Sequence, residues 1–182
     1  MPSYDFGPST RSRKKLTTAV FFLSLILLGA VLFQTSFFGF YKLFGAVPDL
    51  TLVVILCAGL FLGDRCGGVL GLAGGILLGA LGSFGISLLP LFYFLLGFFA
   101  GSIGKGRAES FPGYLLFLSI ALGYRAIMTI IYASMTYRSV NFLTLLWRAV
   151  LPELLATAIL GILLFLPLRA ICRRLDGRNV RS

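Results

Sequence analysis

Few side chains of this sequence could do chemistry, and three of the charged ones stand inside or at the edge of long apolar segments. Arg125 lies 13 residues after Pro112 within one apolar segment, and Glu153 lies six residues after Trp147 within the next. Asp49 stands at the start of an earlier one. A guanidinium or carboxylate surrounded by hydrocarbon is energetically costly, so it usually faces an opposite charge or a watery cavity. These three residues are therefore the first candidates for a site.

The sequence places Arg125 and Glu153 at a similar depth in a membrane. At 1.5 Å per helical residue, Arg125 lies about 20 Å from the inner end of its helix, and Glu153 lies about 9 Å from the outer end of its own. In a hydrocarbon core about 30 Å thick, these depths nearly coincide. We predict an ion pair that clips two adjacent antiparallel helices together. Two other interpretations stay open: a ligand or proton pathway at the pair, and Arg125 reaching the membrane surface alone.

The residue types argue against an enzyme. The chain has no histidine, which removes the commonest ligand for zinc or copper and the usual general base. The three cysteines, Cys57, Cys66 and Cys172, fall in or beside apolar segments and do not form a disulfide framework. Motifs for phosphate binding, zinc proteolysis or nucleophilic hydrolysis are missing from the sequence. We expect no catalytic residues, no metal and no cofactor.

Long segments without charged side chains indicate whether water or lipid surrounds the protein. Hydrophobic residues make up 58% of the 182 residues and charged ones 12%, with a mean hydropathy of +0.98. Residues 16–41, 50–63 and 66–104 carry no charged side chain. A helix needs about 20 mainly apolar residues to cross the bilayer. The chain is therefore expected to be an all-α integral membrane protein.

The apolar segments divide into six expected transmembrane helices, at residues 16–35, 48–63, 67–81, 86–103, 111–135 and 147–171. Residues 66–104 would form a single helix about 58 Å long, roughly twice the hydrocarbon thickness, so we place a turn at 82–85. The domain organisation is then a basic cytoplasmic tail at 1–15, a membrane domain at 16–172 and a second basic tail at 173–182. Four spans remain an alternative, with the two short segments forming a re-entrant hairpin.

The basic residues predict the orientation. The net charge of +10 would suggest nucleic acid in a soluble protein, but here the basic residues lie at the ends of the apolar segments. With six spans, twelve of them fall on the cytoplasmic side: Arg11, Arg13, Lys14, Lys15, Arg65, Lys105, Arg107, Arg169, Arg173, Arg174, Arg178 and Arg181. Only Lys42, Arg138 and Arg148 fall outside. Both termini are expected in the cytoplasm, where the arginines would contact anionic inner-leaflet lipids.

Small residues form a stripe on the third expected helix. Five glycines recur at intervals of four, namely Gly63, Gly67, Gly71, Gly75 and Gly79, and Gly97 and Gly101 repeat the spacing in the fourth helix. This spacing keeps the small residues on one face, where another backbone can approach closely. The stripe serves either packing within the monomer or docking of another membrane protein.

The chain from about Gly45 to Leu175 resembles the bacterial rod-shape-determining protein MreD family. The resemblance rests on four segments, Val47-Pro48-Asp49-Leu50, the spaced Gly67, Gly71 and Gly75, Leu151-Pro152-Glu153-Leu154-Leu155, and Leu166-Pro167-Leu168-Arg169. Two positions depart from it. Gly79 stands where members often carry an acidic residue, and Thr157 stands where they often carry Asn.

The resemblance implies a six-helix fold related to the substrate-binding S components of energy-coupling-factor transporters. It also implies a non-enzymatic role in the cell-wall elongation machinery of the bacterial inner membrane. The implied partners are the membrane scaffold MreC, the actin-like MreB, the SEDS glycosyltransferase RodA and a class B penicillin-binding protein. We expect docking through the glycine-rich third and fourth helices and through an outer corner at Pro48 and Asp49.

Two other functions stay open. The chain could be an S component that captures a small ligand from outside, although such a site needs several convergent polar groups. The outer half offers little beyond Asp49, Arg125, Asn141 and Glu153. It could also be an accessory subunit of another membrane complex.

Overall fold

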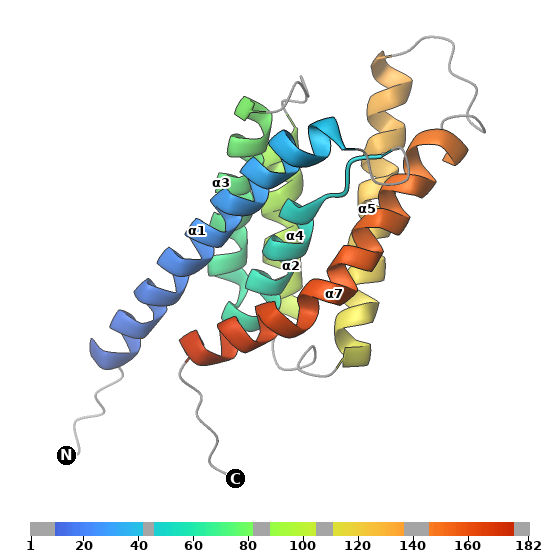
Figure 1. The fold of residues 1–182 in the computed structure, drawn as a ribbon. Helices are drawn as coiled ribbons and strands as arrows, with labels where there is room; N and C mark the ends of the chain where they lie inside the picture. Colours follow the sequence, from blue (N-terminus) through green and yellow to red (C-terminus); the bar gives the residue numbers. More distant parts are fainter. Residues whose placement is uncertain (1–9, 42–45, 82–87, 105–110, 137–145, 177–182) are drawn as a thin grey trace, which may run out of the picture.

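The computed structural model describes residues 10–41, 46–81, 88–104, 111–136 and 146–176, and its elements there are helices. They are α1 (Thr10–Phe40), α2 (Leu50–Leu62), α3 (Asp64–Leu81), α4 (Leu89–Gly104), α5 (Phe111–Thr136), one π-helical turn η1 (Leu146–Val150) and α7 (Leu151–Asp176). Successive helices run in opposite directions (Figure 1). As a result, α1 begins and α7 ends at the same end of the bundle, which we call the terminal end.

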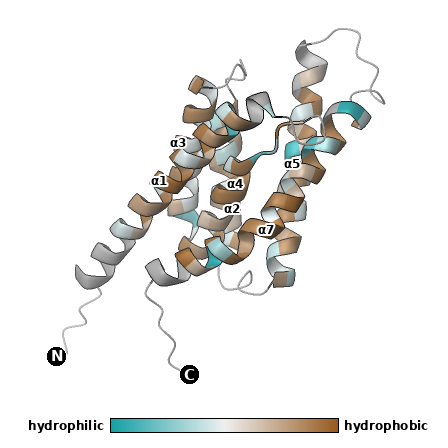
Figure 2. Ribbon diagram, in the orientation of Figure 1, coloured by the Kyte–Doolittle hydropathy of each residue, from teal (hydrophilic) through white to brown (hydrophobic). Residues whose placement is uncertain are grey.

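The helices have the length and composition of a membrane protein. Within the described residues, four segments are long and apolar enough to cross a bilayer: Thr17–Phe37, Asp64–Leu81, Phe111–Ile131 and Leu146–Ile171. Two further apolar helices, α2 and α4, are shorter. Many large apolar side chains on α1, α5 and α7 are exposed, and apolar residues dominate these helices in Figure 2. Such a surface suits lipid rather than water.

The shortest helix is the core of the bundle. In α2, all eleven residues from Leu50 to Leu60 are buried. Side chains from α1, α3, α4, α5 and α7 surround it. At 13 residues α2 is only about 20 Å long. It is covered by protein rather than lipid, so its length need not match the bilayer.

A single residue joins α2 to α3. Gly63 has φ 99°, a left-handed conformation that glycine adopts without steric cost, and its N–H still bonds to the Gly59 carbonyl 2.9 Å away. Asp64 then lies in the first turn of α3, where a carboxylate stabilises the positive helix end. The expected start of the third helix at Gly67 is therefore three residues late. The charged residues that suggested a loop belong to the helix.

The glycine stripe packs against α4. A Cβ atom on Gly67 would overlap the Gly97 carbonyl, and one on Gly71 would overlap the Tyr93 carbonyl. A Cβ atom on Gly75 would lie 2.5 Å from the Pro90 Cα. The stripe thus serves packing within the monomer. The expectation that these three glycines dock another protein is wrong, because α4 already covers them.

Gly79 differs from the rest of the stripe. Nothing lies within 4 Å of a Cβ built on it, so it has open space beside it. The expected turn at residues 82–85 lies outside the described residues.

The outermost helices extend further than the sequence indicated. Helix α1 begins at Thr10 rather than 16, and α7 continues through Pro167 to Asp176 rather than ending near 171. Basic residues expected in the tails therefore stand on helix ends. A helix that has nucleated in an apolar segment can continue, because each added residue gains a backbone hydrogen bond.

Candidate functional site: a buried polar cluster

The predicted ion pair is present. The Nε of Arg125, on α5, lies 2.9 Å from Oε1 of Glu153, on α7, with hydrogen-bond geometry. Only 13% of the Arg125 side chain and 16% of the Glu153 side chain are exposed. The pair joins two antiparallel helices at matching depth, as the helical rise predicted.

Asp49 joins this pair from the segment before α2. Its Oδ1 accepts a hydrogen bond from the Leu52 N–H at 2.9 Å, which makes it the N-cap of α2. Its Oδ2 lies 3.4 Å from Arg125 Nε and accepts a hydrogen bond of 2.5 Å from the Tyr93 hydroxyl on α4. One carboxylate therefore starts a helix and contacts two others.

Thr157 connects the same segment to α7. Its Oγ1 accepts a hydrogen bond from the Asp49 N–H at 2.9 Å and donates one to the Glu153 carbonyl at 2.7 Å. We call Asp49, Tyr93, Arg125, Glu153 and Thr157 the polar cluster. Its members come from α4, α5, α7 and the connection between α1 and α2, so the cluster fixes these elements relative to one another.

Aromatic rings complete the surroundings of the guanidinium. The Cζ of Arg125 lies 5.8 Å from the centre of the Phe92 ring, and Phe92 stacks on Tyr124 with centres 4.5 Å apart. The negative face of an aromatic ring attracts a cation, and the attraction is stronger where water is excluded. Arg125 is thus held by two carboxylates and an aromatic ring.

A second polar contact joins α1 to α2. Gln34 is only 4% exposed, and its Oε1 accepts hydrogen bonds from the Thr51 N–H at 3.1 Å and from the Thr51 hydroxyl at 2.9 Å. This contact has a signal in the sequence, because Gln34 is the only amide side chain in the uncharged segment 16–41. The signal was not recognised.

The polar cluster overturns one expectation. Pro48 and Asp49 were expected to form an outer corner that docks a partner, but both are buried, and Asp49 is only 1% exposed. The Asp49 side chain is used within the monomer. Pro152 is partly buried and stands near the start of α7, directly after the π-helical turn η1.

The chemistry open to the cluster is limited. It holds one guanidinium and two carboxylates, and the carboxylate oxygens named above accept hydrogen bonds within the bundle. Among the described residues, no group of three or more His, Cys, Asp or Glu side chains could hold a metal ion. The arrangement resembles a structural clip more than a catalytic centre.

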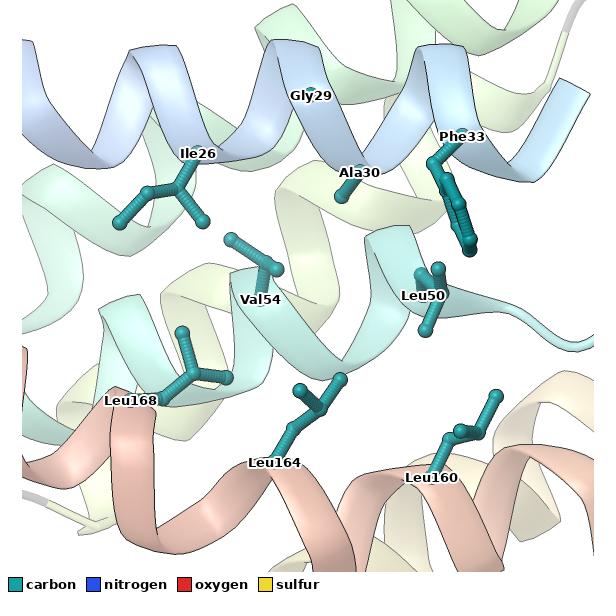
Figure 3. A pocket seen from close by; sticks show the side chains of 9 residues that line it. All are labelled: Ile26, Gly29, Ala30, Phe33, Leu50, Val54, Leu160, Leu164 and Leu168. Carbon is teal, nitrogen blue, oxygen red and sulfur yellow. The ribbon is translucent and has the colours of Figure 1, made fainter. Parts of the chain in front are cut away.

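Two cavities lie beside the cluster's helices, and both are lined by apolar side chains. One, of about 440 Å³, lies between α1 and α7 over α2, and its lining residues point toward one another in Figure 3. The other, of about 450 Å³, lies between α4 and α5 over Leu56 of α2, and Tyr124 supplies its only side-chain hydroxyl. A site for a polar ligand needs several polar groups converging on it. Neither cavity offers them.

Comparisons with protein-family models, with curated proteins and with solved structures gave no match. The fold and the site together define a class, an all-helical membrane protein whose central helix is capped by a carboxylate that is paired with an arginine of a neighbouring helix.

Proposed function

We propose that this chain is a non-enzymatic membrane component of the bacterial cell-wall elongation machinery, of the MreD kind. In this proposal it crosses the inner membrane six times, has both termini in the cytoplasm, and positions other membrane proteins such as MreC. The mechanism is the stabilisation of one arrangement of the partners, which requires a difference in affinity between arrangements and no bond chemistry.

The observation that supports the proposal is that the charged groups of the polar cluster pair within the bundle. Arg125 pairs with both Asp49 and Glu153, and the two described cavities are lined almost entirely by apolar side chains. An enzyme needs polar groups positioned to contact a reacting substrate, and a transporter needs them for its ligand. A membrane adaptor needs a rigid bundle with an apolar outer surface.

The arrangement of the helices supports the six-span topology. Their alternating directions bring the start of α1 and the end of α7 to the terminal end, as an even number of crossings requires (Figure 1). The short α2 and α4 fit this topology if protein covers their ends. An S-component-like fold remains part of the proposal.

The partner surface must differ from the one first expected. Gly67, Gly71 and Gly75 are covered by α4, and Asp49 is buried. Partners would therefore contact the outward side chains of the helices, which include Val69 and Ile76 on the exposed face of α3.

Depletion of the protein in its own bacterium, followed by microscopy and affinity purification, tests the proposal. We expect rod-shaped cells to become round, and the tagged chain purified in mild detergent to bring MreC with it. The matched control is a tagged membrane protein of similar size and expression. Unchanged cell shape together with co-purification of a paired ATPase and a coupling subunit would instead identify an S component.

A further inference from the structure

The cavity between α4 and α5 opens on the outer surface of the bundle. Its rim consists of exposed apolar side chains, Phe99 and Ile103 on α4 and Leu116 and Ile120 on α5. Its floor is buried and includes Ala100 and Ala121. We call it the α4–α5 groove. In a bilayer it faces the hydrocarbon core.

The size of the groove decides what can fill it. A methylene group occupies roughly the volume of one water molecule, about 30 Å³, so a groove of about 450 Å³ holds about 15 of them, or one acyl chain. A transmembrane helix is about 10 Å wide, and a piece only 10 Å long fills roughly 800 Å³. One acyl chain therefore fits within the groove, whereas a helix would lie across its mouth and leave the floor unfilled.

The groove runs along the helices from near the terminal end. Ile103 is one residue from the end of α4, and Leu116 is five residues from the start of α5. At its other limit, Tyr124 lies about 20 Å along α5. A phospholipid whose headgroup lies at the terminal end could thus extend one chain along the groove.

Among the described residues, positively charged side chains lie at the terminal end. Arg65 is exposed in the first turn of α3, which lies against the end of α4 through the contact of Gly101 with Asp64. The negative charge of the Asp64 carboxylate is stabilised by the N–H groups at the start of α3. The positive ends of α3 and α5 and the negative ends of α2 and α4 lie together at this end and offset one another.

Arg169, on α7, also stands near this end. Its Cζ lies 5.5 Å from the centre of the Phe165 ring, and Phe165 contacts the ring of Phe111 at the start of α5. Its Nε is buried and has no hydrogen-bond partner in the part of the chain that the structure describes. A phosphate oxygen is an acceptor that a guanidinium binds well.

We propose that the α4–α5 groove binds one acyl chain of an anionic phospholipid, with the phosphate at the terminal end of the bundle, the end at which Arg65 and Arg169 stand. The chain supplies the hydrocarbon that fills the groove, and the phosphate complements the arginines. This site is independent of the function proposed above, since it requires only that the chain is embedded in a bilayer.

Native mass spectrometry of the purified chain, with phosphatidylglycerol or phosphatidylcholine of identical chains, tests this site. We expect one phosphatidylglycerol to stay bound to the wild-type chain and to be preferred over phosphatidylcholine. Ile120→Trp places an indole in the groove. The indole takes the space of the chain and removes its packing contacts, so the bound fraction of lipid should fall severalfold. Arg65→Gln should weaken phosphatidylglycerol binding about fivefold and leave phosphatidylcholine unchanged.

The matched control is Ile127→Trp. Ile127 is on the same helix and is 57% exposed, compared with 60% for Ile120, but it does not line the groove. This variant should keep the lipid. Equal binding by Ile120→Trp and the wild-type chain, or loss of lipid in both tryptophan variants, would overturn the site. Equal binding of the two lipids would overturn the role of the phosphate. A transmembrane protein that replaces the lipid, and is lost with Ile120→Trp, would also contradict it.

Discussion

Arg125 binds both carboxylates of the polar cluster through one atom. Its Nε lies 2.9 Å from Glu153 and 3.4 Å from Asp49, and the ring of Phe92 lies beside its guanidinium. Removing one member of a buried ion pair is costly, because the remaining charge has neither water nor a partner. The stability of the bundle should therefore be sensitive to this residue.

Arg125→Gln should lower the free energy of unfolding by about 3–5 kcal/mol, because the buried Asp49 and the largely buried Glu153 lose their cation. Unfolding by increasing SDS in mixed micelles measures this. Arg148→Gln, which changes an exposed arginine of η1, is the control and should have little effect. If both variants unfold alike, the ion pairs do not stabilise the fold. Adding Glu153→Gln to Arg125→Gln should recover part of the loss.

Tyr93→Phe should cost about 1.5–3 kcal/mol, because Asp49 loses a hydroxyl donor in a site that is closed to water. The same unfolding assay applies. Tyr41→Phe removes the same hydroxyl from a side chain that is 70% exposed, and it should be nearly neutral. Similar losses in the two variants would show that the contact between Tyr93 and Asp49 adds no stability.

The sequence predicted part of the polar cluster. The pairing of Arg125 with Glu153 followed from depth, because the helical rise converts residue number into distance along the membrane normal. The contacts of Asp49 with Tyr93 and Thr157 depend on which helices are neighbours in the plane of the membrane. A single sequence contains no comparable information on which helices are neighbours. The capping role of Asp49 was predictable, but its burial was not.

At the scale of the helices, the α3–α4 contact is the closest packing in the described fold. Its glycine spacing predicted a close approach of backbones, but it could not identify the partner as α4 rather than another protein. The joint at Gly63 was missed for a different reason. Asp64 and Arg65 follow an apolar segment, a pattern that is typical of a loop. In the structure, Gly63 alone makes the turn, in a left-handed conformation.

Gly71→Ala should destabilise the fold by about 1–3 kcal/mol, because its Cβ would overlap the Tyr93 backbone. Gly79→Ala is the matched control on the same helix. It meets nothing within 4 Å and should be neutral or stabilising by up to about 1 kcal/mol through helix propensity. SDS unfolding of both variants checks the difference. A stable Gly71→Ala protein would contradict the packing of α3 on α4.

At the scale of the whole molecule, the sequence predicted an all-helical membrane protein from its uncharged segments. It did not predict that α2 would be the core. A run of apolar residues looks the same whether lipid or protein surrounds it, and only its shortness gave a signal.

The predicted topology can be tested with cysteines introduced into a variant that lacks Cys57, Cys66 and Cys172. In Trp147→Cys, the cysteine at an exposed position in η1 should react with a membrane-impermeant maleimide added outside intact cells. In Arg65→Cys, the cysteine should react only after the membrane is permeabilised, because six spans place it in the cytoplasm. Labelling of both from the same side would contradict the topology.

The position of α2 has a consequence for biogenesis. A 13-residue helix is too short to partition alone from the insertion machinery into lipid. Since Gly63 joins it directly to α3, the two would leave the translocon as a hairpin. The segment at the centre of the finished protein would then depend on later-made helices to shield it, and an interrupted chain would expose it to quality-control proteases.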